Sequence, residues 1–137
     1  MFARRVYLIA AVYGLLVLVP QYFLENRTGR DFPPPITHPE YFYGFLGVAI
    51  AWQLAFLVIS RDPVRYRPLM IPAIVEKATF AVATVVLFTV GRLSAQMLAA
   101  GLVDATLGVL FTAAYVRTPA WSASTVVSGR ESRGASR

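Results

Sequence analysis

Residues 41–60 read YFYGFLGVAIAWQLAFLVIS and contain no charged side chain. A helix of about 20 apolar residues, rising about 1.5 Å per residue, spans the roughly 30 Å hydrocarbon core of a bilayer. Three further windows have this character: residues 6–24, which are also uncharged, residues 69–91 and residues 95–116. The bilayer offers no partner to free backbone groups, and four spans are too few for a closed barrel. The sequence therefore predicts an all-α protein with four transmembrane helices.

The composition of the whole chain agrees with a membrane protein. Of its 137 residues, 57% are hydrophobic and 15% are charged, whereas about 45–50% apolar residues is usual in soluble domains. The chain has no cysteine, which excludes disulfides and thiolate metal sites. His38 is its single histidine, too few for a zinc or haem site built from imidazoles. We therefore predict no metal and no cofactor.

The polar segments predict how the helices are connected. Residues 25–40 hold four of the nine prolines and are expected to form a loop with an extended piece. Residues 61–68 form a short basic loop. The segment GRLS at residues 91–94 is short enough to make the third and fourth helices antiparallel neighbours. The domain then covers residues 1–118, and the Ser-, Gly- and Arg-rich tail at residues 119–137 is expected to be disordered.

The arginines predict an orientation. Nine fall on one side of the predicted membrane, namely Arg4, Arg5, Arg61, Arg65, Arg67, Arg117, Arg130, Arg133 and Arg137. Three fall on the other side, namely Arg27, Arg30 and Arg92. By the positive-inside rule both termini are cytoplasmic. The same placement explains the net charge of +6 without nucleic acid, which we exclude as a partner.

The start of the chain also resembles a signal peptide, since Arg4 and Arg5 precede an apolar run. That run is too long for a typical signal sequence, and no small-x-small cleavage site follows Pro20. We therefore expect the first helix to be retained. Arginine outnumbers lysine twelve to one, which suggests a GC-rich bacterial genome and hence a bacterial inner membrane.

Small residues spaced four apart predict where the helices touch, because membrane helices associate through close packing and polar contacts. In the fourth helix Ala100, Asp104, Gly108 and Thr112 share one ridge. The second helix has Gly47, Ala51 and Ala55, and the first has Ala10 and Gly14. Since Asp104 lies among small residues, we expect its side chain to face protein and not lipid.

Every predicted helix carries a polar side chain near the middle of the membrane. Counted from the centre of each span, Tyr13 and Gln53 lie within about 5 Å of the midplane. Glu76 and Lys77 lie about 5–7 Å toward the cytoplasm, and Asp104 lies a few ångströms the other way. These five residues are our candidate site. We expect Tyr13, Gln53, Lys77 and Asp104 to form a buried cluster, with Glu76 near its edge. No catalytic or metal-binding residue is proposed.

Three interpretations of these polar residues compete. In the first they only stabilise the fold, with Lys77 extending to the inner headgroups and Asp104 protonated or bonded to Gln53. In the second they line a cavity for an apolar molecule with a polar head, such as a quinone or another isoprenoid lipid. In the third Asp104 and Glu76 form a proton or ion relay. Neighbours on a helix point about 100° apart, so Glu76 and Lys77 should not face one partner, which favours an outward Lys77.

The layout of residues 1–118 resembles that of the DoxX-like small bacterial membrane proteins with four helices. The likeness includes a basic start before a glycine-containing helix (Arg4, Arg5, Gly14), an aromatic and glycine-rich second helix (Tyr43, Gly44, Gly47) and the basic turn Arg61, Asp62, Pro63, Arg65. The resemblance implies a four-helix bundle, and some members of that group look like subunits of quinone-linked oxidoreductases. It carries over no catalytic residue.

Together these features predict a non-catalytic accessory subunit, or a bundle that binds a lipid-like or quinone-like ligand. The alternative is a small proton-coupled transporter that uses Asp104 and Glu76. The sequence contains no phosphate-binding, nucleophile-elbow or zinc-protease motif, so an enzyme is the less favoured class. The expected partners are membrane lipids and either further copies of the chain or a larger membrane complex.

Overall fold

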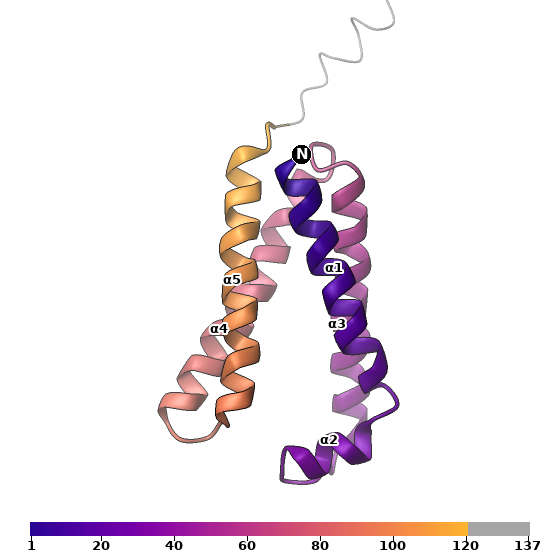
Figure 1. The fold of residues 1–137 in the computed structure, drawn as a ribbon, viewed down its shortest axis with the longest axis vertical. Coiled ribbons are helices and arrows are strands. Elements are labelled where there is room, and N and C mark those ends of the chain that lie inside the picture. The colour runs from indigo at the N-terminus through magenta and orange to yellow at the C-terminus, as the bar shows by residue number, and fades with distance from the viewer. Residues whose placement is uncertain (121–137) are drawn as a thin grey trace, which may run out of the picture.

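The computed structural model describes residues 1–120, which form a bundle of α-helices (Figure 1). Its helices, in chain order, are α1 (Phe2–Gln21), α2 (Glu25–Asp31), α3 (Pro39–Arg61), the 3₁₀ turn η1 (Arg67–Leu69), α4 (Met70–Thr89) and α5 (Ala95–Arg117). Four of these segments are long and apolar enough to cross a membrane, with η1 continuing into α4. The predicted four-helix bundle is therefore confirmed. The predicted disordered tail lies, from residue 121 onward, outside the described residues.

The surface of the bundle suits a lipid environment. Large apolar side chains point outward along the long helices, and Leu16, Val109 and Val116 are exposed to 72%, 69% and 73%. Such a continuous apolar surface is uncommon on monomeric proteins in water. The molecule is accordingly a small multi-pass membrane protein.

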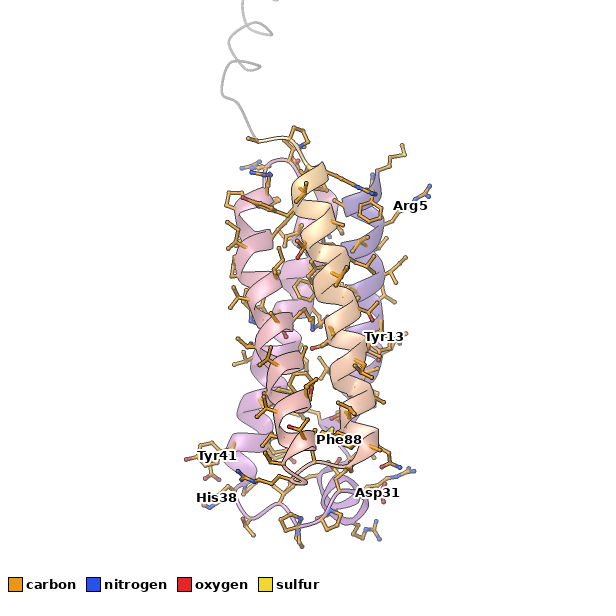
Figure 2. All side chains as sticks on the ribbon, turned by 90° about the vertical axis from the view of Figure 1, so that its left-hand side faces the viewer. Arg5, Tyr13, Asp31, His38, Tyr41 and Phe88 are labelled. Atoms are coloured by element: carbon orange, nitrogen blue, oxygen red, sulfur yellow. The ribbon has the colours of Figure 1, made fainter. Side chains whose placement is uncertain are left out.

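The long helices pack as two pairs, α1 with α3 and α4 with α5. The pairs meet at the end where the chain begins and where α5 ends, and they separate toward the end that carries α2 (Figure 1). Figure 2 shows Arg5 at the first of these ends, Asp31 and His38 at the second, and Tyr13 about midway. The bundle is therefore closed at one end and splayed at the other.

Three aromatic rings hold the pairs together at the closed end. Tyr7 of α1 stacks on Phe111 of α5 with ring centroids 4.2 Å apart, and Phe56 of α3 meets Phe111 edge-on at 5.0 Å. All three side chains are fully buried. Alanines surround them and let the helix backbones approach, namely Ala3, Ala10, Ala11, Ala73 and Ala114. This aromatic cluster joins α1 and α3 of one pair to α5 of the other.

The tight turn between α4 and α5 forms as the sequence predicts. Gly91 has a positive φ of 71°, its N–H donates to the Phe88 carbonyl, and the Arg92 N–H donates to the Leu87 carbonyl. This is the Schellman arrangement that ends helices at glycine. Ser94 then caps α5, its Oγ accepting from the Met97 N–H at 3.4 Å. The two helices therefore run antiparallel and side by side.

Two local expectations were wrong. The segment predicted as a loop begins with the short helix α2, which has Glu25 in its first turn and Arg30 in its last, where each charge complements the helix dipole. Tyr43 of α3 donates to Glu25 Oε2 at 2.8 Å and ties α2 to the bundle.

The predicted contact stripe on α3 also fails, because Gly47 and Ala51 face outward. The face of α3 that packs instead carries Leu46, Ala49, Gln53 and Phe56.

The pairing of α4 with α5 depends on a glycine. A Cβ on Gly101 of α5 would collide with the Thr84 side chain of α4, whereas a Cβ on Gly47 of α3 would meet no atom within 4 Å. We predict that Gly101→Ala lowers the free energy of unfolding in mixed micelles by about 1–3 kcal/mol. The matched Gly47→Ala should be neutral or slightly stabilising, because alanine favours helix. Equal effects of the two substitutions would contradict this packing.

Candidate functional site

Three charged side chains meet between α4 and α5. Lys77 Nζ lies 3.2 Å from each carboxylate oxygen of Asp104 on α5. The same nitrogen lies 3.1 Å from Oε2 and 3.3 Å from Oε1 of Glu76, its neighbour on α4. Lys77 is buried, while the side chains of Glu76 and Asp104 keep 24% and 18% of their exposure. One ammonium group is thus held between two carboxylates, and we call these residues the charged triad.

The expectation that Lys77 extends to the headgroups was wrong. Its stem lies against α5, where Gly108 has no side chain and a Cβ would be 3.5 Å from Lys77 Cβ. The ammonium therefore reaches Asp104, which faces the protein as its position among small residues predicts. Glu76 and Lys77 do leave the helix in different directions, but both side chains are long enough to meet again at the ammonium. A charge pair across the helix interface replaces the solvation that headgroups would supply.

The structure shows no hydrogen bond from Gln53 or Tyr13 to the charged triad. Gln53 is buried, and its Nε2 donates to the Ala49 carbonyl of its own helix at 3.1 Å. Its amide oxygen lies against Gly14 of α1, where a Cβ would collide with it. Tyr13 is 46% exposed. The bond between Asp104 and Gln53, one of the two states considered for Asp104 in the first interpretation, is therefore not formed, although all five candidate residues line one cavity.

That cavity lies between the two helix pairs and has a volume of about 450 Å³. Its polar lining includes Tyr13, Gln53 and the charged triad. The apolar lining comes from all four long helices and includes Val17, Leu18, Phe45, Val48, Trp52, Phe80, Met97, Val103 and Leu107. The apolar wall could not be recognised in the sequence, because every helix is apolar on all sides and only the splay of the pairs selects this face.

The charged triad marks the boundary between the packed and the splayed halves of the bundle. Lys77 Nζ lies 5.6 Å from the ring centroid of Phe56, which belongs to the aromatic cluster. The cavity residues on α1 run from Ala10 to Gln21, away from Tyr7 and toward α2. The cavity is therefore closed by aromatic rings at one end, with a cation beneath them, and its apolar wall continues toward α2.

Other charged groups in the described residues lie outside this cavity. His38 is exposed, and its Nδ1 lies 3.1 Å from Glu40 Oε1 at the start of α3. Arg67 donates from Nε to the Tyr115 carbonyl at 3.3 Å and stacks on the Tyr115 ring at the closed end. In residues 1–120 no group of three or more His, Asp or Glu side chains is placed to hold a metal ion.

Comparison of the chain with protein-family models, curated proteins and solved structures gives no match. No family is assigned. The structure shows a small membrane protein with four candidate spans and a polar site between them.

Among the described residues, Lys77 is the one cation beside the two carboxylates, so its loss should be costly. We predict that Lys77→Met lowers the free energy of unfolding in micelles by about 3–5 kcal/mol, the usual cost of breaking a buried ion pair. Arg27→Met provides the control, because Arg27 pairs with Asp31 at 3.3 Å on the exposed surface and should contribute less than about 1 kcal/mol.

A second variant separates charge from packing. Adding Glu76→Gln and Asp104→Asn to Lys77→Met removes all three charges and should restore most of the lost stability. If Lys77→Met costs no more than Arg27→Met, the triad is not the buried ion pair described above.

Proposed function

We propose that this protein is a non-catalytic membrane subunit that binds a lipid-like or quinone-like molecule between its two helix pairs. The observation that carries the proposal is a single cavity with a polar closed end and an apolar wall. A molecule with a polar head and an apolar tail matches both parts. The head would lie at the charged triad and Gln53, and the tail would follow the wall toward α2.

The size of the cavity supports a ligand of this kind. Pockets that bind small molecules have volumes of about 300–1,000 Å³ and are mostly apolar with a few polar groups. At about 450 Å³ the cavity fits a head group and the first part of a tail. Because the helix pairs separate toward α2, a longer tail would leave the cavity sideways, between the pairs, and continue into the bilayer.

The arginines support a location in a bacterial inner membrane with both termini in the cytoplasm. Within residues 1–120, six arginines lie at the closed end, namely Arg4, Arg5, Arg61, Arg65, Arg67 and Arg117. The layout likeness to DoxX-like proteins favours assembly with a larger, quinone-linked complex. The outward face of α3 with Gly44 and Gly47 leaves room for a close helix neighbour, so a homo-oligomer is the other form we propose.

Filling the cavity tests the binding function. Both Ala99 and Ala100 of α5 are exposed, but Ala100 lines the cavity and Ala99 does not. We predict that protein extracted in mild detergent retains a small amphiphile that native mass spectrometry detects. Ala100→Phe should lose most of this bound material, and Ala99→Phe should keep it. Equal retention by the two variants, or no bound molecule in the unmodified protein, would argue against the proposal.

A small proton-coupled transporter is the second candidate. The observation that favours it is the pair of carboxylates, Glu76 and Asp104, which both line the cavity and share one lysine. Intramembrane carboxylates in such positions often serve as proton relays. The two functions separate in proteoliposomes. A transporter alone moves solute or protons and stops when Asp104 is replaced by Asn, whereas a binding subunit gives no flux.

A further inference from the structure

The charges in the middle of the bundle do not balance. Within the described residues, α1 carries no charge after Arg5, and α3 carries none between Glu40 and Arg61. Between their ends, α4 and α5 contribute only Glu76, Lys77 and Asp104. The only other titratable group in the cavity lining is the Tyr13 hydroxyl. Two carboxylates therefore face one ammonium, and one negative charge is left over when both are ionised.

The extra negative charge can be compensated by a group that enters the cavity. Both carboxylates line it, and both keep part of their exposure, whereas the lysine between them is buried. An unmatched carboxylate at this depth is unfavourable unless it is neutralised, paired or hydrated. A cation that enters the cavity can approach Glu76 or Asp104 without displacing Lys77.

The rest of the lining also suits a cation. The side chains of Tyr13, Trp52 and Phe80 bring aromatic rings to the wall. Aromatic faces attract ammonium groups, and several rings around one site are a common way of binding quaternary ammonium. Gln53 adds an amide to the same lining. An anionic head would meet two carboxylates, and a neutral head would leave the extra charge to be neutralised by a proton.

We infer that the ligand is an amphiphile with a single positive charge, an alkylammonium whose head lies between the aromatic rings and the carboxylates of Glu76 and Asp104. This inference rests on the proposed binding function and specifies the head group, so that of the ligands proposed above it keeps the lipid-like amphiphile and excludes the quinone. The alkyl chain follows the apolar wall toward α2. The ligand is a free amphiphilic cation and not a zwitterionic lipid, because the phosphate of such a lipid would be repelled by the two carboxylates.

Trp52 in the cavity wall provides the test. The chain has two tryptophans, Trp52 and Trp121, so Trp121→Phe leaves Trp52 as the single tryptophan, which is excited selectively over the tyrosines. The variant is placed in phosphatidylcholine nanodiscs and titrated with 2-bromododecyltrimethylammonium or with 2-bromododecanol, whose bromine lies next to the head group. Both have the same chain, and their bromine quenches tryptophan on contact. The comparison variants carry Asp104→Asn in the cavity or Asp31→Asn on the exposed surface, which is the same chemical change outside the cavity.

We expect the ammonium compound to quench Trp52 at a concentration at least about tenfold lower than the alcohol does, the range of one charge-assisted contact. Asp104→Asn should remove this preference, because Glu76 then balances Lys77, and Asp31→Asn should keep it. Should Asp104→Asn fail to fold, Glu76→Gln removes the same single charge and should give the same result. Both concentrations are expressed per lipid, after the partition of each compound into empty nanodiscs has been measured, so that the different partition of the two compounds does not enter the comparison.

Two other results would overturn the inference in distinguishable ways. If the alcohol binds as tightly as the ammonium compound and Asp104→Asn changes neither, the ligand is neutral and the binding function stands without the positive head. If neither compound quenches more strongly in the unmodified cavity than in one filled by Ala100→Phe, the cavity binds no amphiphile and the proposed function fails as well.

Discussion

The feature on which the structure depends is the charged triad of Glu76, Lys77 and Asp104 inside a helix bundle that is otherwise apolar at this depth. Charges within a bilayer are expensive unless they meet one another or water. Lys77 meets both carboxylates within 3.3 Å, and this contact joins α4 to α5 along the stretch where Gly101 and Gly108 allow close approach. The pairing therefore fixes how these two helices are rotated against each other.

The second constraint is the uneven contact between the two helix pairs. The aromatic cluster of Tyr7, Phe56 and Phe111 closes one end, and nothing comparable joins the pairs beyond the triad within residues 1–120. Lipid tails are as apolar as the helix faces, so packing and polar contacts, not exclusion from water, hold the pairs together. A cavity beside the last polar contact follows from this arrangement, and it is where the proposed ligand binds.

The four helices could be predicted from the sequence because length and polarity are sufficient to define a membrane span, and Gly91 marked the turn. The inward direction of Asp104 was also readable, from the small residues around it. The direction of the Lys77 side chain could not be read from the sequence. Whether it reaches the headgroups or Asp104 depends on how α4 and α5 are rotated against each other. The partners of Gln53, the outward face of Gly47 and the cavity wall around Trp52 depend in the same way on how α3 is rotated against α1, and they could not be foreseen either.

Lys77 is the single lysine of the chain, and Asp104 is the only aspartate within a long helix. Solid-state NMR of protein in lipid bilayers, labelled with ¹⁵N-lysine and with ¹³C at the aspartate side-chain carboxyl carbon, therefore measures their contact directly. We predict strong dipolar coupling between the lysine ammonium nitrogen and a carboxyl carbon, and its loss in Asp104→Asn. An ammonium signal without this coupling in the unmodified protein would place Lys77 at the headgroups and contradict the buried triad.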